Sequence, residues 1–68
     1  MRIVYDAQAD ALSLVFREVE AEQSRELAPG LIVNLDREGN AVAIEVLDAR
    51  LKIGRDGLSL IKIDLQQL

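Results

Sequence analysis

Apolar residues recur at every second position over much of this 68-residue chain, and that spacing indicates β-strands. Ile3 and Tyr5 begin the pattern, and the segment Leu12 to Phe16 repeats it a few residues later. Asp6, between the two runs, is well placed to accept hydrogen bonds from the backbone N–H groups that follow it. The two runs are therefore expected to form a hairpin with a wide, ordered loop.

A second hairpin is predicted between Leu31 and Leu47, where two apolar runs flank the turn sequence Asp-Arg-Glu-Gly-Asn. Gly39 fits the left-handed position that follows a type I turn, which makes a three-residue loop with a glycine bulge. In this register Leu35 faces Ala41 and Val33 faces Ala43. One face then carries Leu31, Val33, Leu35, Ala41 and Ala43, and the other carries Ile32, Val42, Ile44 and Val46, with Asn34 as its one polar member.

Both faces of this hairpin are apolar in that register, although an antiparallel sheet with one solvated face alternates apolar and polar residues. A chain of 68 residues is too short to cover two apolar faces by itself. We therefore predict a homodimer in which one face of the hairpin packs against its symmetry mate. The predicted interface residues are Ile32, Val42, Ile44 and Val46.

The rest of the chain predicts an edge strand, a short helix and a last strand. Arg17 to Ala28 is charged, and we interpret it as a strand end, a polar turn near Glu20 to Glu22 and an edge strand from Arg25 to Ala28, since charges discourage pairing with other chains. Asp48 suits the N-cap of a short helix, and Gly54 suits its end. Ile61 to Leu65 alternates again. The expected fold is mostly β (α+β), a small antiparallel sheet of five or six strands built from hairpins with one short helix after Asp48, in a single domain.

The residue types that are missing exclude several kinds of chemistry. Without histidine and cysteine, the chain lacks the usual general base near neutral pH, a thiol nucleophile and the common ligands of structural zinc, and no cofactor is expected. The net charge of −4, with both signs interspersed, argues against binding to nucleic-acid phosphates. No apolar run reaches the ~20 residues of a membrane-spanning helix, and no signal-peptide pattern opens the chain, so a cytoplasmic protein is expected.

Carboxylates are the remaining candidates for a catalytic or cation site. Asp6 and Asp10, four residues apart, could share a cation, and so could Asp36, Glu38 and Asn40 in the hairpin turn. Neither stretch has the glycine and the final acidic ligand that a calcium-binding loop needs at fixed positions. We interpret both groups as structural, because the preferences of turns explain them better.

Glu45 is a third candidate, because the predicted register places it on an otherwise apolar face, beside Ala43 and opposite Leu31. Burial makes a carboxylate harder to ionise, which is the property that a general acid or base needs. The alternative is that Glu45 lies at the rim of the sheet or pairs with Arg2 or Arg50. We favour that alternative, since no nucleophile or oxyanion donor is visible nearby.

Two segments of the chain, taken in order, resemble a small bacterial family catalogued as domain of unknown function 2283. One follows the family pattern Tyr-Asp-Pro-x-Ala-Asp-Ala-Leu, and the other an Asp-x-Asp/Glu-Gly-Asn turn with a run like Val-Gly-Ile-Glu-Ile-Leu-Asp-Ala-Ser. The matching residues are Tyr5, Asp6, Ala9, Asp10, Ala11, Leu12, Asp36, Glu38, Gly39, Asn40, Ile44, Glu45, Leu47, Asp48 and Ala49. Ala7 replaces the usual proline, Ala43 a frequent glycine and Arg50 a common serine. The resemblance supports the fold and transfers no catalytic or binding residue.

We expect a non-enzymatic interaction module. Some relatives in the family are encoded beside small toxin-like proteins. The resemblance therefore implies that the chain is the antitoxin-like half of a two-protein system, with a small protein partner encoded nearby. The alternative is a carboxylate-based cation-binding protein or small enzyme that uses Asp6, Asp10 or Glu45. Nucleic-acid binding ranks third.

Overall fold

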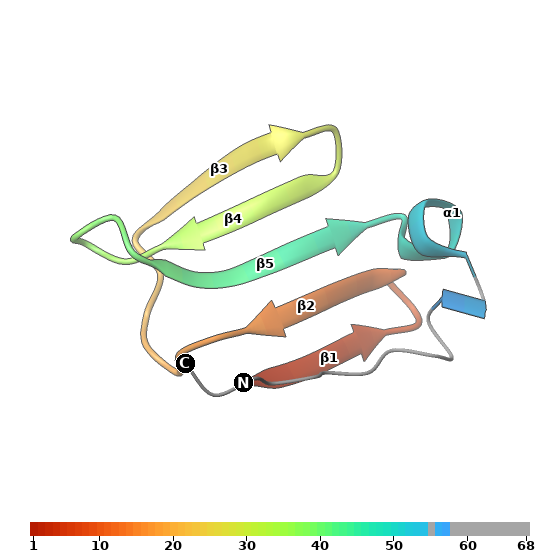
Figure 1. The fold of residues 1–68 in the computed structure, drawn as a ribbon, viewed down its shortest axis with the longest axis horizontal. Coiled ribbons are helices and arrows are strands. Elements are labelled where there is room, and N and C mark those ends of the chain that lie inside the picture. The colour runs from red at the N-terminus through yellow and green to blue at the C-terminus, as the bar shows by residue number, and fades with distance from the viewer. Residues whose placement is uncertain (55, 58–68) are drawn as a thin grey trace, which may run out of the picture.

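The computed structural model describes residues 1–54 and 56–57, which form five strands and the short helix α1 (Figure 1). Along the chain these are β1 (Arg2–Asp6), β2 (Ala11–Val15), β3 (Gln23–Ala28), β4 (Leu31–Leu35), β5 (Ala41–Leu47) and α1 (Ala49–Ile53). The strands make one open antiparallel sheet in the order β1-β2-β5-β4-β3. The predicted fold class is confirmed. The predicted last strand, Ile61 to Leu65, lies outside the described residues.

The loop between β1 and β2 is closed by Asp6, as its position suggested. One carboxylate oxygen of Asp6 accepts hydrogen bonds from the backbone N–H groups of Gln8 (3.0 Å) and Ala9 (3.2 Å). Asp10 then turns the chain into β2 with a φ of 53°, in the left-handed region that few residues other than glycine adopt. This hairpin places the carboxylate of Asp10 at the end of the sheet where α1 begins.

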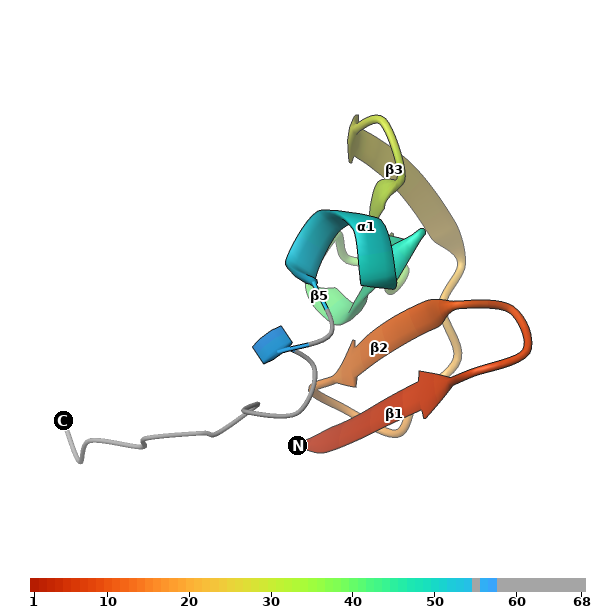
Figure 2. The same ribbon diagram turned by 90° about the vertical axis from the view of Figure 1, so that its right-hand side faces the viewer.

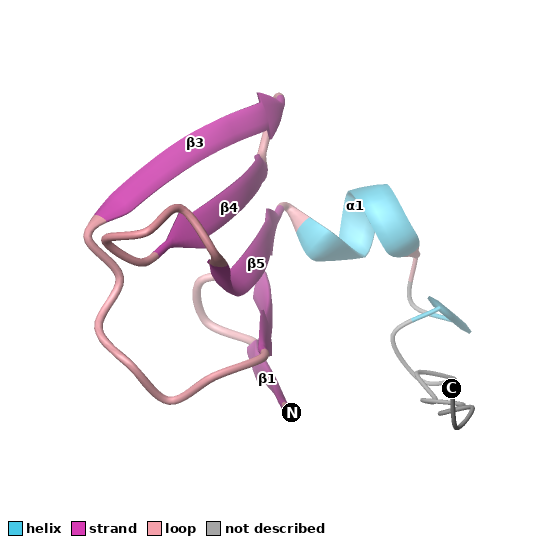
Figure 3. Ribbon diagram, turned by 60° about the vertical axis from the view of Figure 1, so that its left-hand side comes forward, coloured by secondary structure: helices cyan, strands magenta, loops and turns pink. Residues whose placement is uncertain are grey.

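Helix α1 lies beyond the end of β5, to one side of the sheet (Figures 2 and 3). Asp48 takes the N-cap position of α1 as predicted, but it has a φ of 51° and its side chain makes no hydrogen bond to the helix, so the expected side-chain cap is not formed. Gly54 ends the helix as predicted, in a conformation with a φ of 83°, and its N–H donates to the carbonyl of Arg50.

The register of the β4–β5 hairpin differs from the predicted one by a bulge. Leu35 faces Ala41 as expected, but Val33 faces Ile44 and not Ala43. Val42 is an extra residue on β5, and its carbonyl accepts hydrogen bonds from the N–H groups of Phe16 and Arg17 at the end of β2. A bulge of this kind moves every following side chain to the other face of the sheet.

The bulge gives the sheet one apolar and one mixed face. The apolar face carries Ile3, Tyr5, Leu12, Leu14, Leu31, Val33, Leu35, Val42, Ile44 and Val46. The mixed face carries Val4, Ser13, Val15, Ile32, Asn34, Ala43, Glu45 and Leu47. The expectation that both faces of the hairpin are apolar is therefore wrong. Of the four predicted interface residues, Val42, Ile44 and Val46 lie on the apolar face, whereas Ile32 points to the opposite face.

The core of the described part is small. Leu12, in the middle of the sheet, is 4% exposed, and Val42, Ala43 and Ala49 are also buried. No large side chain among the described residues is completely removed from water. At one edge of the sheet all six residues of β3 are exposed, which confirms the predicted edge strand and extends it back to Gln23.

Candidate interaction surface

The apolar face is the candidate interaction surface of the described sheet. It collects side chains from β1, β2, β5 and β4, which lie next to one another in that order. Leu12 and Val42 are buried, and the other eight of its ten residues keep partial exposure. Arg25, opposite Val33 on β3, continues this face as an exposed charged residue at its border. An apolar centre with a charged border is the usual composition of a protein-binding surface.

The mixed face is crossed by a polar row, formed by Ser24 on β3, Asn34 on β4 and Glu45 on β5. The hydroxyl of Ser24 donates to Oδ1 of Asn34 (2.7 Å), and Nδ2 of Asn34 donates to Oε1 of Glu45 (2.6 Å). Ser13 on β2 lies opposite Glu45 in the register. The row gives this face hydrogen-bonding groups that water can reach, because Ser24 is exposed and the others are partly exposed.

Glu45 is therefore not the isolated carboxylate on an apolar face that the sequence suggested. It lies opposite Ile32, and not Leu31, because the bulge at Val42 reverses its side of the sheet. Its alternative partners Arg2 and Arg50 make other contacts: Arg2 pairs with Glu18 and Arg50 donates to the carbonyl of Ala7. The amide of Asn34 is the polar group that holds Glu45.

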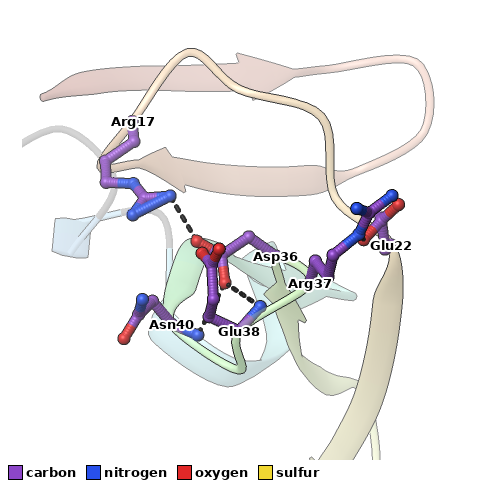
Figure 4. Close-up of polar contacts among 6 residues, drawn as sticks. All are labelled: Arg17, Glu22, Asp36, Arg37, Glu38 and Asn40. Atoms are coloured by element: carbon purple, nitrogen blue, oxygen red, sulfur yellow. Dashed lines mark hydrogen bonds and ion pairs between the residues drawn. The ribbon is translucent and has the colours of Figure 1, made fainter.

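Asp36 organises the turn between β4 and β5, and its carboxylate is buried (Figure 4). It accepts hydrogen bonds from the backbone N–H groups of Asn40 (2.9 Å) and Glu38 (3.0 Å), and it forms an ion pair with Arg17 from the loop after β2. The hydrogen bond from Asn40, the charge of Arg17 and the Glu38 N–H together lower the pKa of Asp36 against the opposing effect of burial. These contacts leave Asp36 engaged as a structural group, as the turn preferences predicted.

Asp10 joins the β1–β2 loop to the helix. Oδ1 of Asp10 accepts hydrogen bonds from the hydroxyl of Tyr5 (2.7 Å) and the backbone N–H of Arg50 (3.1 Å), and its carbonyl accepts from the N–H of Ala49 (3.0 Å). The bond to Asp10 is the main reason that the pKa of Tyr5 is raised. The guanidinium of Arg50 lies 6.0 Å from the centre of the Tyr5 ring. Asp10 thus satisfies the first N–H groups of α1 in place of Asp48.

The structure does not bring the predicted carboxylates together. Asp6 bonds to its own loop, Asp10 to Tyr5 and α1, and Glu45 to Asn34. Within residues 1–54 and 56–57, no group of three acidic side chains is placed to hold a metal ion and no pocket is present. In the same part of the chain no helix is long and apolar enough to cross a membrane.

Sequence reasoning missed two long-range contacts, the Arg17–Asp36 ion pair and the bonds from Asp10 to the start of α1. The first joins residues 19 apart and the second residues 40 apart. The one available signal was the surplus of acceptors in each loop, since the carboxylates of Asp10 and Asp36 can accept more hydrogen bonds than a turn alone supplies.

The chain matches the model of a protein family. The model of a family described as "protein of unknown function (DUF2283)" matches residues 2–50, which span all five strands and the start of α1. The chain therefore belongs to this family, as its two motifs indicated. No curated protein and no solved structure gives a significant match.

Proposed function

We propose that this DUF2283 protein is a non-enzymatic interaction module that binds a partner protein through its apolar face. The observation that carries the proposal is the exposure of that face: eight of its ten apolar side chains, from four adjacent strands, remain in partial contact with water. Burying these side chains against a partner stabilises the complex, by about 25 cal/mol for each Å² of apolar surface removed from water. A contiguous apolar surface of this kind is typical of a binding site on a protein.

The partner that we propose is a small protein encoded next to this one, which makes the chain the antitoxin-like half of a two-protein system. A protein surface fits the apolar face better than a small molecule does, because the described face has no pocket. A flat surface with a charged border, such as Arg25 provides, fits another flat protein surface.

The test is coexpression with the product of the adjacent gene, followed by purification through a tag on one protein. Two matched variants on β4 separate the faces: Val33 lies on the apolar face, Ile32 on the mixed face, and both are β-branched and partly exposed. Val33→Lys is expected to abolish copurification, because it places a charge inside the interface. Ile32→Lys is expected to leave the complex intact.

Circular dichroism of both variants checks that they are folded. The proposal fails if the unmodified proteins do not copurify, or if Ile32→Lys disrupts the complex as much as Val33→Lys does.

A further inference from the structure

The two edges of the sheet differ in how they are protected against pairing with another strand. Figure 1 shows β3 at one edge and β1 at the other. On β3 the register shifts between Glu26 and Ala28, so Leu27 forms a bulge. An antiparallel self-pairing centred on Arg25 or on Glu26 would also set identical charges opposite each other, which is destabilising. Bulges and charges are the usual protection of an edge strand, and β3 has both.

Strand β1 has less of that protection. Its five residues pair with β2 without a bulge, it contains no lysine or proline, and its two charged residues, Arg2 and Asp6, stand at its ends. In the described residues β2 is its one strand neighbour. A regular edge of this kind offers a row of backbone N–H and C=O groups to another strand.

The register identifies which backbone groups of β1 face outward. The N–H of Phe16 donates to the carbonyl of Val42, so Leu14 and Leu12, at every second position, direct their backbone groups toward β5. Ser13, between them, therefore directs its groups toward β1, where it faces Val4. It follows that Val4 bonds to β2, whereas Ile3 and Tyr5 direct their N–H and C=O groups away from the sheet.

We propose that β1 pairs with β1 of a second copy of this chain, antiparallel and centred on Val4. In that register Ile3 lies opposite Tyr5 of the second copy, and Tyr5 opposite its Ile3. Both residues present outward backbone groups, so each of these two pairs exchanges two main-chain hydrogen bonds. The central Val4–Val4 pair is a non-hydrogen-bonded pair, in which side chains approach most closely.

The charges at the two ends of β1 are complementary in the same register. Arg2 lies opposite Asp6 of the second copy, and the two-fold axis repeats the contact at the other end. The loop hydrogen bonds use Oδ1 of Asp6, and the ion pair with Glu18 uses Nε and Nη2 of Arg2, which leaves Oδ2 of Asp6 to accept from Nη1 of Arg2. No such match exists at β3. This complementarity selects a second copy as the occupant of the edge, and it makes the pairing independent of the apolar face and of the proposed function.

Single cysteines in the full chain test the register, because the chain has no cysteine of its own. Paired Val4 positions are about 4.5 Å apart between Cα atoms, within the range of a disulfide. Arg2 positions are separated by four residues along the strand, about 13 Å, which is too far. Under mild oxidation Val4→Cys is expected to form a covalent dimer, and the matched variant Arg2→Cys is expected to stay monomeric. A mixture of Arg2→Cys with Asp6→Cys is expected to crosslink.

Light scattering during size exclusion tests the association without crosslinking. The unmodified chain is expected to show twice its mass of 7.5 kDa at about 100 μM, in the micromolar range where a weak pair still forms. Val4 is 37% exposed, so a charge at this position is expected to leave the fold intact. Val4→Lys and Val4→Glu are each expected to dissociate at least tenfold more readily, whereas an equal mixture of the two recovers the dimer. Val4→Thr, which is uncharged and β-branched, is the control and keeps the dimer.

Amide hydrogen exchange at Ile3 and Tyr5 completes the test, since the pairing protects their outward N–H groups. Protection that rises with protein concentration supports the proposal. The proposal is overturned if the unmodified chain has the monomer mass and Val4→Cys crosslinks no faster than Arg2→Cys. It is also overturned if the two amides are protected in a monomer, because the edge is then covered within one chain.

Discussion

Truncation of Leu12 to alanine is predicted to remove a large share of the stability of this domain. Leu12 is the second residue of β2, opposite Tyr5 on one side and Val46 on the other, and is 4% exposed. Leu→Ala removes three carbon atoms, or about 2.4 kcal/mol at roughly 0.8 kcal/mol for each buried group. The cavity that remains adds to this cost, but neighbours on an open face can move into part of the space.

We therefore expect a loss of about 3 kcal/mol, near the lower end of the range for buried leucines. A domain of 68 residues has a total stability of roughly 3–10 kcal/mol, so the variant loses at least about a third of it. The melting temperature should fall by about 12–24 °C, at about 4–8 °C for each kcal/mol. Thermal and urea unfolding followed by circular dichroism measure both quantities, at one fixed protein concentration so that association does not differ between samples.

Leu51→Ala is the matched control, because Leu51 on α1 is 85% exposed and alanine suits a helix. It should change the stability by no more than about 0.5 kcal/mol. Equal losses in Leu12→Ala and Leu51→Ala would refute the placement of the core on this part of the sheet.

Three further predictions concern the turns and the carboxylates. The lowered pKa of Asp36 stabilises the fold at pH values above the ordinary value of about 3.9, and this contribution is lost as the pH falls through the lower folded value. Asp36→Asn should therefore reduce the melting temperature at pH 7. Between pH 4 and pH 2 its melting temperature should differ less from that of the unmodified chain. Gly39→Ala should lower the free energy of unfolding by about 1 kcal/mol in urea, because the φ of Gly39 is 86°, in the left-handed region, and nothing lies within 4 Å of an added Cβ. Gly39→Asn should lower it less, and equal losses would contradict a purely backbone effect. Calcium, magnesium and manganese should leave the melting temperature unchanged, whereas a rise that Asp10→Asn abolishes would restore the cation-binding alternative.

The strands and their hairpins could be predicted because the alternation of apolar residues acts locally. Ile3 and Tyr5, and then Leu12 and Leu14, mark their strands without reference to the rest of the chain. The turn at Gly39 could be predicted for the same reason, since a left-handed residue is a local requirement. These features needed no knowledge of which strands become neighbours.

The bulge at Val42 could not be predicted from alternation. Val42 and Ala43 are both apolar, so either can follow the turn on either face, and the pattern is compatible with both registers. The hydrogen bonds that Val42 accepts from Phe16 and Arg17 come from β2, which is far away in the sequence. Because side chains alternate, this one residue reversed the expected side of Glu45 and separated Ile32 from the rest of the predicted interface.

Asp10, and not Asp48, satisfies the first N–H groups of α1 for a similar reason. Asp48 immediately precedes α1 and has a suitable side chain, so local rules select it as the cap. In the folded chain Asp48 is left-handed, and Asp10 bonds to the N–H groups of Ala49 and Arg50. Tertiary contacts can satisfy the end of a helix as well as local ones can, and a single sequence carries no signal for the choice between them.

The two proposals combine into one geometry. A two-fold axis at Val4 runs perpendicular to the sheet, so pairing of β1 keeps both apolar faces on the same side of one continuous sheet. Ile3 and Tyr5 then meet across the axis and join the two apolar faces. A partner that is itself dimeric could contact both faces at once. After the first face is bound, the second contact is intramolecular, so the complex is tighter than one with a single face bound. Val4→Lys should therefore weaken binding to a dimeric partner while a monomeric partner binds as before, whereas Val33→Lys should weaken both.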